Sequence, residues 1–269
     1  MSQPRHLIVA ATLLAVAACG TEKKTSVDED GGAIRFSAHE ISAESRTCVE
    51  SEGTCARVHL KFIETTGGGT EAARGNIEIY LLHDLVSRMR SLLPEEVGNS
   101  INNPEGLAAA FLAEHRAFVE AFPDATAGWS VEITASAIAS TPTVATLDIT
   151  EFAYTGGAHP NTRRRLVSFD VESGQLLGVD DLTTDIDTLT SLAERQLRLD
   201  QGLGAEDDLE TAGFWFPKEG FSLPDNLGIT ADGIVFHWDA YEIAPYSMGP
   251  IDVTVSSADL NPIVDKNFW

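Results

Sequence analysis

Apolar residues alternate with polar residues in the first part of the chain, which is typical of strands. Residues 34–41 and 56–63 fit this pattern, and in the second segment Val58, Leu60 and Phe62 lie on one face while Arg57, His59 and Lys61 lie on the other. Three consecutive glycines, Gly67–Gly69, end the unit. The pattern therefore predicts two neighbouring strands joined by a loop.

Helical spacing replaces alternation after these glycines. Asn76 is a candidate N-cap for a helix over 77–92, and Pro104 opens a second helix over 104–122 that Pro123 ends. The stripes expected to face the core are Ile77, Tyr80, Leu81, Leu85 and Met89, and Leu107, Phe111, His115, Phe118 and Phe122.

The rest of the chain returns mainly to strand patterns. Strands are expected at 129–139, 144–154, 164–171 and 175–179, a helix at 187–199, and short strands around Phe221, 234–238 and 251–255. Consecutive strands with helices in blocks predict an α+β fold. We expect antiparallel sheets with helices packed on one face, in two intimately associated subdomains at 34–140 and 141–269.

The N-terminal segment has the pattern of a bacterial lipoprotein signal peptide. Its apolar run, Leu7–Val16, is too short to span a bilayer, and Val16-Ala17-Ala18-Cys19 matches a lipobox. We expect cleavage after residue 18, a lipid on Cys19 and a polar tether over 19–33. The alternative is an ordinary secretory signal with a chance cysteine.

Charge and the residues after Cys19 refine the expected location. No aspartate follows Cys19, so in a Gram-negative cell we expect an outer-membrane lipoprotein that faces the periplasm. The formal net charge is −23, which disfavours nucleic-acid binding and would attract a basic protein. Solubility alone is the other explanation of this charge.

Two cysteines remain after lipidation. Cys48 and Cys55 lie seven positions apart in the loop between the first two strands, and an exported protein meets an oxidising compartment. We expect them to form a disulfide. The histidines of the chain are scattered and show no metal-ligand spacing, so we expect no metal and no cofactor.

Two short segments carry candidate chemistry. The first, residues 154–161, places a histidine on a loop with two glycines, so His159 is a candidate base, ligand or hydrogen-bond anchor. The second, residues 236–249, groups aromatic rings near an acid, an arrangement that suits sugar stacking or a protein contact. Core packing is the alternative for both. The candidate binding residues are Tyr154, Gly156, Gly157, His159, Asn161, Trp238, Tyr241, Glu242 and Tyr246.

One basic triplet interrupts the acidic composition. Arg163, Arg164 and Arg165 fall on a predicted strand, where successive side chains point to opposite faces. We therefore do not expect them to form one continuous basic patch.

The two candidate segments also carry a family resemblance. The run YTGGAHPN at 154–161, with VSFD at 167–170 and Ser173-Gly174, resembles the outer domain of RsiV-type anti-sigma factors. Residues 221–249 are similar to the C-terminal half of that domain. A related domain precedes the catalytic part of PdaC-type peptidoglycan deacetylases, and residues 34–140 resemble the preceding deacetylase-associated region more weakly.

The resemblance implies binding rather than catalysis. In the anti-sigma factors this outer domain senses lysozyme by binding it, and in the deacetylases a separate domain performs the chemistry. The metal-ligand motifs of that catalytic domain do not occur in this sequence. The resemblance therefore implies a lipid-anchored binding module for a cell-wall glycan or a lysozyme-like basic protein. The alternatives are a peptidoglycan hydrolase or deacetylase that uses His159, and a structural envelope lipoprotein.

Overall fold

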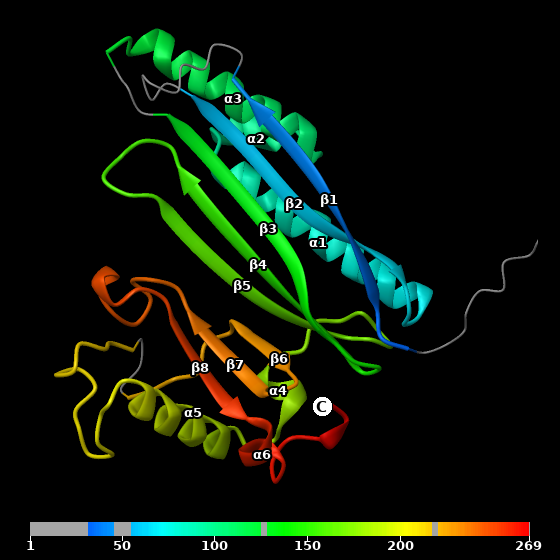
Figure 1. Ribbon diagram of the computed structural model, residues 1–269, viewed down its shortest axis with the longest axis vertical. Coiled ribbons are helices and arrows are strands. Elements are labelled where there is room, and N and C mark those ends of the chain that lie inside the picture. The colour runs from blue at the N-terminus through cyan, green and yellow to red at the C-terminus, as the bar shows by residue number, and fades with distance from the viewer. Residues whose placement is uncertain (1–31, 46–54, 125–127, 217–219, 269) are drawn as a thin grey trace, which may run out of the picture.

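The computed structural model describes residues 32–45, 55–124, 128–216 and 220–268. The expected signal peptide, Cys19, most of the tether and Cys48 lie outside these ranges, so the lipid anchor and the disulfide stay predictions. The described part is an α+β fold with two sheets, as the sequence predicts (Figure 1). None of its helices is long and apolar enough to cross a bilayer.

A five-stranded sheet forms the larger half, with the order β1-β2-β3-β4-β5. Its strands are Arg35–Glu44 (β1), Ala56–Gly67 (β2), Trp129–Ser140 (β3), Val144–Tyr154 (β4) and Asn161–Asp170 (β5). β2 and β3 run parallel, whereas every other neighbouring pair is antiparallel. The expectation of a purely antiparallel sheet is therefore wrong at this pair, because the helical block carries the chain back to the end from which β2 began.

Three helices form that crossover: Glu71–Ser91 (α1), Glu95–Asn99 (α2) and Pro104–Ala121 (α3). α1 and α3 lie on one face of the sheet (Figure 1), and most residues of the predicted apolar stripes are buried between helices and strands. α1 begins earlier than predicted, because Thr70 caps it by accepting a hydrogen bond from the Ala73 N–H. Asn76 lies inside the helix and donates to the Ser173 carbonyl instead.

A three-stranded antiparallel sheet, β6-β7-β8, forms the smaller half. Its strands are Leu227–Thr230 (β6), Gly233–Trp238 (β7) and Ile251–Ser256 (β8). The short helix Val179–Leu182 (α4) leads into Ile186–Asp200 (α5), which packs on this sheet with the short C-terminal helix Ser257–Leu260 (α6) beside it (Figure 1). Two 3-10 turns, Tyr246–Met248 (η2) and Lys266–Phe268 (η3), complete the described elements.

Two of the predicted strands are absent from the described residues. Residues 175–179 contribute a single bridge, between Leu176 and Phe169, before α4 begins. Phe221 lies in an irregular segment, where its ring contacts Phe216 and Trp238. Both segments are apolar enough to resemble strands, but Leu177, Val179 and Phe221 instead pack, half-buried, against the core of the smaller half.

The smaller sheet packs against the face of β4 and β5 that is turned away from α1. Gly228 on β6 makes this close approach possible, since an added Cβ would lie 3.2 Å from side-chain atoms of both Thr146 and Leu166. The predicted subdomain boundary at residue 141 falls between β3 and β4, which are neighbouring strands of one sheet. The division into two domains stays a prediction.

Candidate functional site

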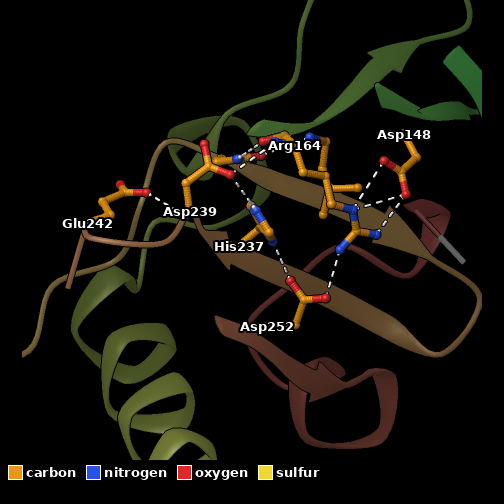
Figure 2. A network of polar contacts seen from close by, with 8 residues as sticks. Asp148, Arg164, His237, Asp239, Glu242 and Asp252 are labelled. Carbon is orange, nitrogen blue, oxygen red and sulfur yellow. Dashed lines mark hydrogen bonds and ion pairs between the residues drawn. The ribbon is translucent and has the colours of Figure 1, made fainter. Parts of the chain in front are cut away.

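A network of charged side chains joins the two sheets (Figure 2). At its centre is His237 on β7, which is 2% exposed. Its Nδ1 lies 2.5 Å from Asp252 Oδ1 on β8, and its Nε2 lies 3.1 Å from Asp239 Oδ1 just after β7. Because strand side chains alternate, His237 and Asp252 face β4 and β5 while Trp238 faces α5.

Arg164 connects this pair to the larger sheet. Its Nε and Nη2 donate to both carboxylate oxygens of Asp148 on β4, at 2.8–3.1 Å, and its Nη1 donates to Asp252 Oδ2 at 2.7 Å. The backbone N–H of Arg164 also donates to Asp239 Oδ1 at 2.9 Å. Two cations therefore share three carboxylates across the boundary between the sheets.

The charges in this network hold one another in the ionised state. Burial alone would lower the pKa of His237, but hydrogen bonds to Asp239 and Asp252 and their negative charges raise it to about 9. Burial alone would raise the pKa of Asp252, but His237 and Arg164 hold it below its ordinary value. His237 is therefore an imidazolium at neutral pH, with both ring nitrogens acting as donors.

A polar cleft of about 420 Å³ opens beside this network. It runs along the outer edge of β5, between the C-terminal half of α1 and the segments just before β6 and just after β7. Asn226 covers part of that edge by accepting from the Leu166 N–H and donating to the Arg164 carbonyl. The charged residues that line the cleft are Asp84, Arg88, Glu151, Arg163, Arg164, Arg165, Asp225, Asp239 and Glu242.

Exposed rings form a second feature beside the cleft. The rings of His159 and Tyr246 stack with centroids 4.7 Å apart and planes inclined by 26°, and Tyr246 contacts Tyr241 at 5.3 Å and 31°. Tyr241 is 58% exposed and Tyr246 is 45% exposed. We call these three residues the aromatic ladder. It joins the two candidate segments that the sequence identified, although they are about 80 positions apart.

Two backbone features position the ladder. The β4–β5 loop has positive φ angles at Gly156 (90°) and Gly157 (122°), and the Tyr154 hydroxyl donates to the Gly157 carbonyl at 3.1 Å. Tyr241 has a φ of 72°, which is uncommon outside glycine and turns its ring outward at the tip of the turn after β7. Asn161 is exposed at the start of β5.

The other predicted site residues have different roles. Trp238 is 2% exposed and lies in the core of the smaller half, so its ring does not line the surface. Glu242 lines the cleft and accepts from the Asp239 N–H at 2.9 Å, which closes the turn that carries Tyr241. Cys55 is buried at the start of β2, and its expected partner Cys48 lies outside the described residues.

In the described part of the chain, the ring of His159 has one hydrogen-bond partner and one stacking partner. Its Nδ1 donates to the carbonyl of the adjacent Pro160 at 2.9 Å, and Tyr246 stacks on its ring. Within the described ranges, no carboxylate lies within ion-pair distance of its ring. Nor do those ranges contain three or more His, Cys, Asp or Glu side chains placed so that they could hold a metal ion.

The sequence alone does not reveal the charged network, because its members come from four separate strands and one turn. In the sequence, Arg164 is the middle of a basic triplet and His237 is one residue of the aromatic segment 236–249, with nothing to connect the two. The alternation of β7 separates His237 from the apolar Phe236 and Trp238, and this is the one local sign that it faces a different environment.

Comparisons with known proteins agree with this fold. Residues 177–258, which contain α4, α5 and all three strands of the smaller sheet, match a family model described as a protein of unknown function (DUF3298). Over 122 residues, or 44% of this chain, the sequence is 26% identical to the peptidoglycan-N-acetylmuramic acid deacetylase PdaC of Bacillus subtilis strain 168. That match spans only 26% of the length of PdaC.

Two solved structures share the architecture. A member of the DUF3298 family from Bacteroides fragilis superposes with a TM-score of 0.68 at 17% identity, covering 89% of this chain and 96% of that one. A DUF3298 family protein from Pseudomonas aeruginosa PAO1 superposes with a TM-score of 0.61 at 19% identity, covering 88% and 96%. At these identities the similarity establishes the fold alone.

Proposed function

We propose that this chain is a non-catalytic binding module of the cell envelope, and that the aromatic ladder binds a cell-wall glycan. The observation that carries the proposal is the ladder itself. Three rings from two loops stack on one another and remain exposed, with a strained backbone at Tyr241. Flat rings of this kind stack on the apolar faces of sugars, and the polar cleft beside them offers hydrogen-bonding groups.

One further observation and one prediction support a cell-wall ligand. The sequence is 26% identical over 122 residues to an enzyme named for its action on peptidoglycan. The expected signal peptide and the lipid on Cys19 would hold the module at the outer membrane, facing the periplasm, where such a glycan is present. An anchor of this kind would also keep a strongly acidic protein at a membrane whose anionic lipids repel it.

Binding to insoluble peptidoglycan tests the proposal. The double variant Tyr241→Asn, Tyr246→Ala removes two rings, and asparagine tolerates the left-handed backbone at position 241. Phe122→Ala, which removes an exposed ring at the end of α3, serves as the matched control. We expect wild type and the control to sediment with the glycan and the double variant to remain in solution. Equal sedimentation of all three proteins would refute the proposal.

A lysozyme-like basic protein is the second candidate ligand, and the net charge of −23 favours it. This ligand should be captured in a salt-dependent manner, because surface charges are screened within about 8 Å at physiological ionic strength. Capture of lysozyme that survives high salt but is lost in the double variant would instead assign the ladder to a protein partner.

A further inference from the structure

We propose that the cleft beside the ladder binds a carboxylate of the same ligand through Arg163 and Arg165, so that the module recognises glycan bearing short anionic peptides. This inference deepens the proposed function and rests on it. Peptidoglycan is a glycan whose sugars carry peptides with free carboxylates, and guanidinium groups bind carboxylates through paired hydrogen bonds.

Most of the charges in the cleft already have partners. Arg88 pairs with Asp84 at 2.6 Å and with the buried Glu151 at 3.3 Å. Arg164 is bound by Asp148 and Asp252. These two arginines therefore balance carboxylates of the protein itself and are not available to a ligand.

The remaining acids of the cleft differ in their hydrogen-bond and ion-pair partners. Asp239 is held by His237 and by the Arg164 N–H, and Glu242 accepts from the backbone of its own turn. Asp225 is exposed, and no ion pair to it occurs within the described ranges. It contributes one negative charge that the protein leaves uncompensated.

Arg163 and Arg165 are the two arginines of the cleft that form no ion pair with a described carboxylate. They lie two positions apart on β5, so both side chains point to the α1 side of the sheet. Neither forms an ion pair with a carboxylate in the described part of the chain, and Arg165 contacts the hydroxyl of Tyr80. These two guanidinium groups line a cavity of about 420 Å³ that also holds the acids Asp225 and Glu242. They are the cleft's cations without a carboxylate partner among the described residues, and so the groups that can pair with an anion.

The cleft and the ladder are continuous. The turn from Asp239 to Glu242 lines the cleft at both ends and carries Tyr241 of the ladder between them. On the other side, Arg163 follows His159 by four positions, so their Cα atoms are at most about 14 Å apart. A sugar stacked on the ladder and a peptide attached to it can therefore reach both features at once.

Calorimetric titration with three probes tests the inference: a disaccharide-peptide with free carboxylates, the same fragment with its carboxylates amidated, and a peptide-free glycan oligomer. The test variant is Arg163→Gln, Arg165→Gln, which retains hydrogen-bonding groups but removes the charge. Arg195→Gln on α5, 59% exposed, is the control. Circular dichroism and thermal melting confirm that each variant is folded.

We expect wild type and the control to bind the free-carboxylate fragment about tenfold more tightly than the amidated fragment. The arginine variant should bind both fragments equally and keep wild-type affinity for the peptide-free oligomer. If the variant retains the tenfold preference, the inference is wrong although the proposed function stands. If wild type binds the anionic fragment through these arginines but not the peptide-free oligomer, the inference stands and the ladder proposal fails.

Discussion

The buried imidazolium of His237 predicts a specific dependence of stability on pH. Its pKa is about 9 in the folded protein and about 6.5 when the chain is unfolded and its two carboxylate partners are lost. A histidine with a raised pKa stabilises the fold fully below pH 6.5, and this contribution disappears as the pH rises towards 9. The free energy of unfolding should therefore fall between these pH values.

The pKa difference sets the magnitude. One pKa unit corresponds to about 1.4 kcal/mol, so the two pKa values correspond to about 3 kcal/mol. Asp252 is 49% exposed, and water screens its charge, so we expect an observed loss of about 2 kcal/mol. At low pH the sign reverses: the depressed pKa of Asp252 means that its contribution is present above about pH 4 and is lost as the pH falls further.

Urea unfolding followed by tryptophan fluorescence measures this effect, since Trp238 is buried next to His237. Wild type is compared with His237→Gln at several pH values from 6 to 9.5. We expect the stability of wild type to decline through this window while the variant stays flat, so that the two curves converge at high pH. Parallel curves would show that His237 is not charged in the folded protein, and the account of the network would be wrong.

Three further substitutions test the local structure, each by urea unfolding. Arg88→Met leaves Glu151, 2% exposed, without its cation and should cost about 3 kcal/mol, most of which Glu151→Gln should restore; a neutral effect would mean that water already solvates this carboxylate. Thr70→Ala removes the cap on the Ala73 N–H and should cost about 1 kcal/mol, whereas an unchanged midpoint would place the start of α1 elsewhere. Gly174→Ala forces a side chain into a position with φ of 69° and 2.3 Å from the Ala73 carbonyl oxygen, so it should cost about 2 kcal/mol, and full stability would contradict the close contact between this turn and α1.

The sequence predicts those parts of the fold that depend on short-range periodicity. The alternating apolar residues of β4 and the buried stripe of α3 follow directly from local spacing, and the structure confirms both elements. Pairing between distant strands does not follow from local spacing. The parallel pair of β2 and β3 arises from the path of the chain through α1–α3, and the residue pattern of each strand taken alone does not reveal it.

The candidate site was predictable to a similar extent. Glycine, histidine and aromatic content singled out both loops, and the structure brings His159 against Tyr246. The sequence leaves open whether Trp238 faces the core or the surface, because alternation places it on one face with Phe236 but does not say which face is covered. The ion network joins residues of β4, β5, β7 and β8, and only the packing of the two sheets brings them within hydrogen-bond distance.

The affinity of the folded chain for a peptide-free glycan oligomer, measured by calorimetry, tests the central claim most directly. We expect wild type and Phe122→Ala to bind with the same affinity. The double variant Tyr241→Asn, Tyr246→Ala should bind at least about tenfold more weakly, because it removes the apolar area that two rings would bury against the sugar, and about 1.4 kcal/mol corresponds to a factor of ten. Equal affinity of the double variant, or no binding by wild type, would contradict the assignment of the aromatic ladder as a glycan-binding surface.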